Sequence, residues 1–273
     1  MTALSEGEQK FDNTVTGETG VNPADQFNIR KLSSNAPMRW LEQGVKDYKA
    51  LIVPSTTVGM VYVVLGFLLM WLGWEYPIFI TSLGATFLII GPLVAVGFYV
   101  MSYELERGHK LNFIEATQSS LAFMKGNAVS LFYFAMVLGV LMGVWALISA
   151  LTAVAFLDTT VVRGDFLGTI MAQSNLFLFL LAYALGALLI AVVAFSISVI
   201  TAPMLTHRKV DVVTAMMTSI DVIKKNPTVM FTWALMIAVM VFIGSALFFV
   251  GLAVTLPILG HASWHVYRDV LEN

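Results

Sequence analysis

The sequence predicts an all-α, polytopic membrane protein with six transmembrane helices arranged as three hairpins. Of its 273 residues, 58% are hydrophobic and only 12% are charged, whereas a soluble domain carries about 25% charged residues. Apolar runs long enough to cross a hydrocarbon core of about 30 Å recur along the chain, and an internal repeat relates them to one another. The mean hydropathy of the chain is +0.83, which excludes an ordinary cytosolic enzyme.

Residues 1–34 are expected to form a disordered cytoplasmic tail, because they contain scattered acidic residues and almost no apolar periodicity. Such a segment cannot bury enough surface to offset the entropy lost on ordering. A short docking segment around Phe27, Ile29 and Leu32 is the alternative interpretation. We expect no cleavable signal peptide, since no apolar core lies near the start, and we expect residues 35–273 to form the membrane domain.

Five apolar regions follow the tail. They lie at about 57–74, 77–101, 129–156, 176–202 and 228–260. As a single helix the last region would be about 50 Å long at 1.5 Å per residue, which exceeds one crossing. It is either one tilted helix or a hairpin whose turn lies near Gly244 or Gly251.

The placement of Lys and Arg favours the hairpin. Basic residues prefer short cytoplasmic loops, and they occur before the first crossing and in the loops 102–128 and 206–227. The C-terminal Arg268 joins that side only if the last region crosses twice. The pattern therefore predicts six crossings with both ends in the cytoplasm. A five-crossing version would misplace only this one arginine.

An internal repeat leads to the same number of crossings. The segment His109–Phe132 aligns with Arg208–Phe231, 99 positions later, with matching Lys, Ala, Ser, Asn and Phe residues. Asn112 and Asp211 align as N-cap residues, and Glu115 completes a capping box with the first. A third, fainter copy lies at Trp40–Pro54. Its aligned pairs are Gly44 with Ser120 and Lys49 with Lys125.

Each predicted unit consists of an amphipathic helix, two crossings and a proline that marks the exit. The three units share one orientation and are therefore parallel repeats. The units span about 36–108, 109–207 and 208–270; their amphipathic helices lie at about 36–50, 112–126 and 211–225; and their exit prolines are Pro92, Pro203 and Pro257. Asn127 and Asn226 should mark matched turns into the next crossing.

The three amphipathic helices each combine an apolar stripe with lysines near the C-terminal end. Helices of this kind lie in the membrane interface, and their lysines complement the helix dipole and anionic headgroups. We expect them to form a collar at the cytoplasmic face, where membrane lipids would bind. The alternative is that they are ordinary polar loops with coincidental spacing.

His261 and His265 are four residues apart and share one helix face with Trp264. Such a pair can hold a metal ion or haem, but a third ligand is missing nearby, and Asp269 is the single acid in the same helix. The position at the exit of the last helix favours interfacial anchoring or hydrogen bonding. The two histidines are thus weak metal candidates, and we predict no metal and no cofactor other than bound lipid.

Several functions lack their usual residues. The apolar regions contain no Asp, Glu, Lys or Arg, which disfavours a proton-coupled transporter. No GxSxG, HExxH, P-loop or dinucleotide motif is present, so no enzymatic activity is predicted. The absence of cysteine excludes disulfides and thiolate metal sites. A net charge of −2 gives no reason to expect nucleic acid as a partner.

Small residues recur on the apolar helices. Gly139 and Gly143 form a GxxxG pattern, and Gly186 belongs to a small-xxx-small variant with Ala182. Such patterns allow close approach of helices in lipid. They serve either packing within the bundle or an interface with a second copy or a foreign subunit.

Three stretches carry a family resemblance: Trp40–Asp47 with Pro54, Gly91–Gly108, and Leu256–Asp269 with its GHASWHVYRD segment. They resemble a domain-of-unknown-function family of predicted bacterial integral membrane proteins. The resemblance implies location and topology. Some relatives carry a cytochrome c oxidase subunit I label, but this chain has only four histidines and lacks the six-histidine haem and copper set of that subunit.

The function predicted from these observations is that of a non-enzymatic accessory subunit, or an assembly or scaffold factor, of a membrane complex such as a respiratory or photosynthetic one. The alternative is a transporter or lipid facilitator with a site at the repeat interface. An enzyme would require polar groups that converge around His207, His261 and His265. The expected partners are lipids and a larger membrane complex or a second copy.

Overall fold

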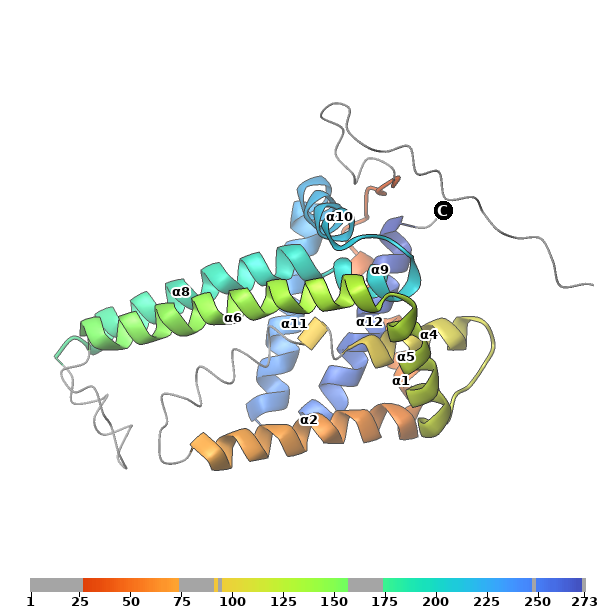
Figure 1. Cartoon of the computed structure of the whole chain (residues 1–273), viewed down its shortest axis with the longest axis horizontal. Coiled ribbons are helices and arrows are strands. Elements are labelled where there is room, and N and C mark those ends of the chain that lie inside the picture. Colours follow the sequence, from red (N-terminus) through yellow and green to blue (C-terminus); the bar gives the residue numbers. More distant parts are fainter. Residues whose placement is uncertain (1–26, 74–90, 93–94, 157–173, 247–248, 272–273) are drawn as a thin grey trace, which may run out of the picture.

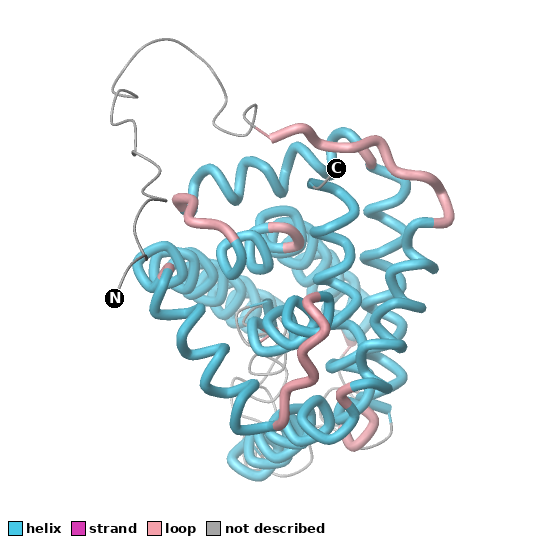
Figure 2. Tube along the Cα trace, turned by 90° about the vertical axis from the view of Figure 1, so that its right-hand side faces the viewer, coloured by secondary structure: helices cyan, strands magenta, loops and turns pink. Residues whose placement is uncertain are grey.

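The computed structural model describes residues 27–73, 91–92, 95–156, 174–246 and 249–271. All regular structure within them is helical (Figure 2), which confirms the all-α class. The helices are α1 (Ala36–Ala50), α2 (Ile52–Gly73), α4 (Val96–Glu106), α5 (Phe113–Gly126), α6 (Ala128–Phe156), α8 (Leu176–Ser198), α9 (Thr201–His207), α10 (Val212–Lys225), α11 (Pro227–Ala246) and α12 (Leu252–Leu271).

Three stretches of the described chain are long and apolar enough to cross a membrane. They are Ala128–Phe156, Leu176–His207 and Pro227–Ala246, and a fourth exists if α1 and the first part of α2, bent by 103°, count as one broken span. The chain is thus an integral membrane protein with several apolar helices. The predicted crossing 77–101 lies largely outside the described residues. Six crossings in three hairpins stay a prediction.

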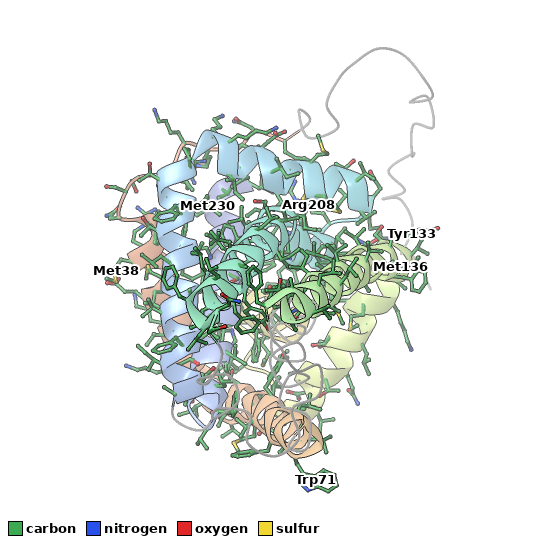
Figure 3. The ribbon with its side chains drawn as sticks, turned by 90° about the vertical axis from the view of Figure 1, so that its left-hand side faces the viewer. Met38, Trp71, Tyr133, Met136, Arg208 and Met230 are labelled. Atoms are coloured by element: carbon green, nitrogen blue, oxygen red, sulfur yellow. The ribbon has the colours of Figure 1, made fainter. Side chains whose placement is uncertain are left out.

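The apolar helices do not all run in one direction. In Figure 1, α6 and α8 lie side by side and extend together away from the rest of the chain, and α2 extends the same way below them. α11 and α12 run across this direction. Figure 3 looks along α6 and α8, with Tyr133 and Met136 pointing outward from α6 and Trp71 outward from α2. The molecule thus has a packed body and a projecting apolar pair.

Helices form over the three ranges expected to be amphipathic, with the expected caps. The Asn112 side chain accepts hydrogen bonds from the backbone N–H of Ile114 and Glu115, and the Glu115 carboxylate closes the capping box. Asp211 caps α10 by accepting from the backbone N–H of Thr214 at 2.9 Å. Partial burial raises the pKa of Asp211, but hydrogen bonds from Thr214 and the local backbone outweigh it, so that the pKa is lowered.

α1, α5 and α10 each end at a one-residue break before the next helix. The break residues are Leu51, Asn127 and Asn226, with φ of −123°, −134° and −132° and ψ of 36°, 33° and 51°. The matched turns predicted at the two asparagines are confirmed. Because Leu51 occupies the aligned position of the first copy, the same backbone turn joins all three helix pairs.

The apolar stripe of α5 faces outward rather than into the protein. Ile114, Leu121 and Met124 are exposed, while Ala116 is buried. α10 exposes Val213 but half-buries Ile220 and Ile223, and it buries Val222 together with small or hydroxyl residues. The inner faces can therefore pack closely, and the outer apolar faces are directed to where lipid would lie; their placement in the membrane interface stays a prediction.

Residues 27–34 do not behave as part of a disordered tail. The Asn226 amide donates to the Arg30 carbonyl at 3.0 Å and accepts from the Leu32 backbone N–H at 2.8 Å. Lys225 donates to the Ile29 carbonyl, and Ile29 is buried. The alternative of a docking segment is thus correct for these residues, because a side-chain amide satisfies their backbone. The rest of the predicted tail, 1–26, lies outside the described residues.

The region 228–260 forms two helices, as the hairpin interpretation predicts. The chain leaves α11 at Ala246 and enters α12 at Leu252. A Cβ on Gly251 would lie 2.8 Å from the backbone of Gly244, so the two glycines allow the helices to meet beside the turn.

Pro257 does not mark an exit, because α12 continues through it to Leu271. A proline inside a helix leaves the carbonyl four residues earlier without its usual donor. Here that carbonyl is Ala253 O. The backbone of Gly59 in α2 lies directly against this oxygen, so a Cβ on residue 59 would clash with it. Pro203 lies buried in the short helix α9, and Pro92 lies in a short helical segment.

The contact of α1 with α12 joins the first unit to the last. A Cβ on Gly44 would lie 2.6 Å from the Ile258 carbonyl and 2.7 Å from the Ala262 Cβ. The aligned Ser120 lies beside Gly97 of α4, and Ser219, at the next aligned position, accepts from the backbone N–H of Ile200 just before α9. The three aligned small residues therefore each lie in a contact with another helix or its end, but the helices that they contact differ.

We expect Gly44→Ala to destabilise the protein by about 1–3 kcal/mol, because overpacking forces neighbouring backbone to shift. Gly126→Ala is the matched control, since a Cβ there meets no described atom within 4 Å; alanine is the better helix former, so it should be neutral or slightly stabilising. Thermal unfolding in detergent measures both. Equal midpoints for the two variants would contradict the close α1–α12 contact.

Candidate functional site

A buried polar chain is centred on His261. Its Nε2 lies 2.9 Å from Ser55 Oγ, and its Nδ1 lies 2.8 Å from Ser102 Oγ. Ser102 donates its hydroxyl hydrogen to Asp47 Oδ2 at 2.6 Å, so its oxygen accepts from Nδ1–H of His261. When the imidazole is neutral, Nε2 is then an acceptor, and Ser55 donates to it.

The chain of hydrogen bonds continues to the surface through His265. Nε2 of His265 lies 2.8 Å from the same Asp47 oxygen, and its Nδ1 lies 3.9 Å from Glu106 Oε1. Glu106 also accepts from Trp264 Nε1 at 2.9 Å and pairs with Arg268 Nε at 3.2 Å. Hydrogen bonds thus connect Ser55 in α2 to His265 in α12, and Glu106 at the end of α4 lies next to His265 at a distance longer than a hydrogen bond.

Local sequence explains why these helices meet here. His261 and His265 share the face of α12 that is turned toward α1 and α4, as residues four apart must. Gly44 lets α1 approach, which brings Asp47 to them. Gly260 leaves room for Phe98 of α4, whose ring lies 5.5 Å from the His261 ring.

Burial determines the protonation state of His261. This residue directly follows Gly260, where the last apolar region without charged residues ends. Ser55, Ser102 and His261 are all 0% exposed. Loss of hydration lowers the pKa of His261 to about 4, although the nearby Asp47 carboxylate opposes the shift; the neighbouring His265 adds to it. The imidazole is therefore neutral near pH 7.

Three rings close the junction of α4, α9 and α12. The ring centroids of Tyr103, His207 and Trp264 lie 5.2, 5.4 and 5.7 Å apart. His207 Nδ1 and Arg208 Nε both lie within hydrogen-bond distance of Tyr267 Oη, at 2.8 and 2.9 Å. One aromatic side chain from each of α4, α9 and α12 therefore fills the centre of the junction.

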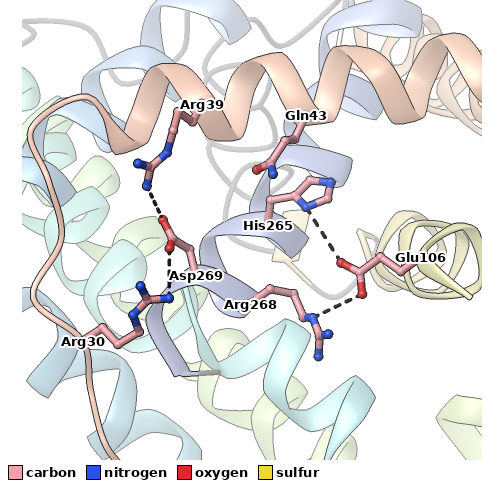
Figure 4. Close-up of a pocket in the computed structure, with 7 residues that line it drawn as sticks. All are labelled: Arg30, Arg39, Gln43, Glu106, His265, Arg268 and Asp269. Atoms are coloured by element: carbon pink, nitrogen blue, oxygen red, sulfur yellow. Dashed lines mark hydrogen bonds and ion pairs between the residues drawn. The ribbon is translucent and has the colours of Figure 1, made fainter. Parts of the chain in front are cut away.

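A polar pocket of about 500 Å³ lies where the network reaches the surface (Figure 4). Asp269 pairs with Arg39 at 2.9 Å and Arg30 at 3.5 Å, and Glu106 with Arg268 forms the opposite side. The residues that line it are Arg30, Arg39, Gln43, Glu106, His265, Arg268 and Asp269. Segment 27–34, α1, α4 and α12 all contribute.

The chemistry available to these groups is that of a hydrogen-bonded network. Among the described residues, no group of three or more His, Asp or Glu side chains is arranged to hold a metal ion. The pair Ser55–His261 has the spacing of a nucleophile and its base, but both side chains are fully buried. Among the described residues, the network meets the surface at Glu106, where the pocket lies.

The sequence identified three members of the network and missed the others. His261, His265 and Trp264 lie in it, and Asp269 is the one acid in their helix, but α1 and α4 bring Asp47 and Glu106 to this helix from elsewhere in the chain. Helical spacing could have identified Asp47, since it lies on the same stripe of α1 as the buried Trp40, Gly44 and Tyr48.

The other singled-out residues lie elsewhere. His207 belongs to the ring junction, on the far side of Trp264 from the serines. Gly139 and Gly143 lie on α6 and Gly186 on α8, in the projecting pair. The polar groups that an enzyme would need around all three histidines therefore fall into two separate sets.

We expect the thermal unfolding midpoint to fall as the pH is lowered from about 7 to 5. An unfolded histidine has a pKa of about 6.5 and folded His261 about 4, so the unfolded state binds more protons in this window and is favoured by acid. His261→Asn removes the titrating group and keeps a donor toward Ser102, so its midpoint should fall less steeply. His109→Asn, on an exposed histidine, is the control. Equal slopes for wild type and His261→Asn would contradict the buried neutral imidazole.

Comparison with known proteins agrees with the membrane assignment. Residues 78–207 match the model of a family described as predicted integral membrane protein (DUF2189). The match ends before the C-terminal segment Gly260–Asp269, which contributes both histidines to the site. No curated protein and no solved structure matches the chain. With its apolar helices, the chain is an integral membrane protein, similar over 78–207 to a family whose description names no activity.

Proposed function

We propose that this chain is a non-enzymatic scaffold or accessory subunit of a larger membrane complex, which it binds through the lateral faces of its membrane helices. The observation that carries the proposal is the surroundings of Gly139 and Gly143. A Cβ on either glycine meets no atom of the described chain within 4 Å. A GxxxG surface allows a second helix to approach closely in lipid, and this one is presented outward.

Gly186 provides the contrast. A Cβ on Gly186 would lie 2.8 Å from Cγ2 of Ile148, so this small residue packs α8 against α6. Beside the two outward glycines, Met136, Val140 and Leu147 are exposed. The projecting pair thus uses one small residue for its own packing and presents two others, within an apolar surface, to an outside helix.

The wider proposal places six crossings in a bacterial inner membrane with both termini in the cytoplasm. The matched breaks at Leu51, Asn127 and Asn226 support a common unit, and the basic loops support the orientation. The alternative of a transporter with a site at the repeat interface has less support, because the rings of Tyr103 and Trp264, with His207 between them, fill the junction.

We expect the double variant Gly139→Leu, Gly143→Leu to lose a partner that copurifies with the wild type in mild detergent, at an unchanged thermal midpoint. Gly186→Leu should lower the midpoint instead, because its side chain collides with Ile148. Quantitative mass spectrometry of the purified complexes measures the partner. A wild-type protein that runs alone in several detergents, or a double variant that keeps its partner, would contradict the proposal.

The absence of cysteine allows the partner to be identified as self or foreign. Gly143→Cys introduces the sole thiol of the chain, so oxidative cross-linking in native membranes reports only this surface. A cross-linked product of twice the chain mass indicates a second copy, and a product of another mass indicates a foreign subunit.

A further inference from the structure

We propose that the pocket between segment 27–34, α1 and α12 binds a phosphate group, supplied either by a phospholipid headgroup or by inorganic phosphate. This goes beyond the proposed scaffold function and does not depend on it. Three guanidinium groups line one space of about 500 Å³, and each comes from a different segment: Arg30, Arg39 and Arg268. A tetrahedral anion presents oxygens in several directions, which suits donors that approach from different sides.

The arginines pair with two partly exposed carboxylates, each of which is bonded to a buried tryptophan. Asp269 receives Arg39 at 2.9 Å and is itself held by Trp40 Nε1 at 2.9 Å. Arg268 pairs with Glu106 at 3.2 Å and lies over the Trp264 ring at 5.8 Å. Figure 4 shows these two clusters on opposite sides of the space, with Gln43 above His265. Positioned donors lose little entropy when an anion binds.

The charge of the lining favours an anion. Three arginines against the two carboxylates of Glu106 and Asp269 leave a formal net charge of +1, although the whole chain carries −2. Gln43 adds an uncharged amide that can donate to an oxygen. A positive excess concentrated in one polar hollow attracts a negative group and not a cation.

Gln43 permits a test that changes one charge and almost no volume. Gln43→Glu places a carboxylate among the donors, and a like charge beside a bound anion weakens its binding. Gln118→Glu makes the same change on α5, where the side chain is also exposed, outside the residues that line the pocket. Arg39→Gln provides a second variant that removes one donor.

The experiment uses full-length protein in detergent, titrated separately with short-chain phosphatidylglycerol, diacylglycerol of the same chain length, and inorganic phosphate. Calorimetry measures binding, and the thermal midpoint without ligand verifies folding. We expect phosphatidylglycerol or phosphate to bind wild type and Gln118→Glu equally, and at least about tenfold more weakly to Gln43→Glu and Arg39→Gln.

Each outcome decides the proposal. Binding of phosphatidylglycerol without inorganic phosphate assigns the site to a lipid headgroup, and binding of inorganic phosphate assigns it to the free ion. Wild-type protein that binds neither overturns the proposal whether or not the variants fold. Diacylglycerol that binds as tightly as phosphatidylglycerol, or equal affinity in Gln43→Glu and Gln118→Glu, overturns it as well.

Discussion

The close packing of α1 against α12 is the constraint on which the described body of the protein depends. Gly44 removes the side chain that would separate the two backbones, and Asp47 then reaches both Ser102 and His265. A buried carboxylate without such partners would be costly, so the glycine and the polar network require each other. Because α1 is the first described helix and α12 the last, this contact joins parts of the described chain that are far apart in sequence.

The polar network has two ends of different character. At the buried end, the neutral His261 is locked between Ser55 and Ser102, which gives the interior a fixed hydrogen-bond direction. At the surface end, Glu106 belongs both to the network and to the lining of the pocket. A group that binds in the pocket would therefore contact the same carboxylate that orients His265 and Arg268.

The packed body and the projecting pair, α6 and α8, differ in the kinds of side chain that they carry. α6 and α8 expose apolar side chains along their length and bury few of them, so lipid or another helix must cover them. α1, α4 and α12 bring together the ionisable side chains of the site. The breaks at Asn127 and Asn226 connect the two kinds of helix and also bind distant backbone, at Leu205 and Arg30 respectively.

Much of the secondary structure follows from local sequence. The composition predicts a helical membrane protein, the caps at Asn112 and Asp211 predict where two helices begin, and the aligned asparagines predict where they end. These features depend on residues close together in the chain, where backbone geometry and hydrogen bonding act within a few positions. The division of 228–260 into two helices followed from length and charge for the same reason.

Long-range packing decided the rest. The pairing of Asp47 with His265 joins residues 218 positions apart, and no local pattern specifies which helix faces which. Residues 27–34 are too polar to order themselves, yet Asn226 satisfies their backbone from 196 positions away. Gly59 of α2 lies against the carbonyl that Pro257 leaves without its usual donor, 194 positions along the chain from Ala253 O. In each case the partner comes from a distant helix, so the contact exists only once the helices have packed.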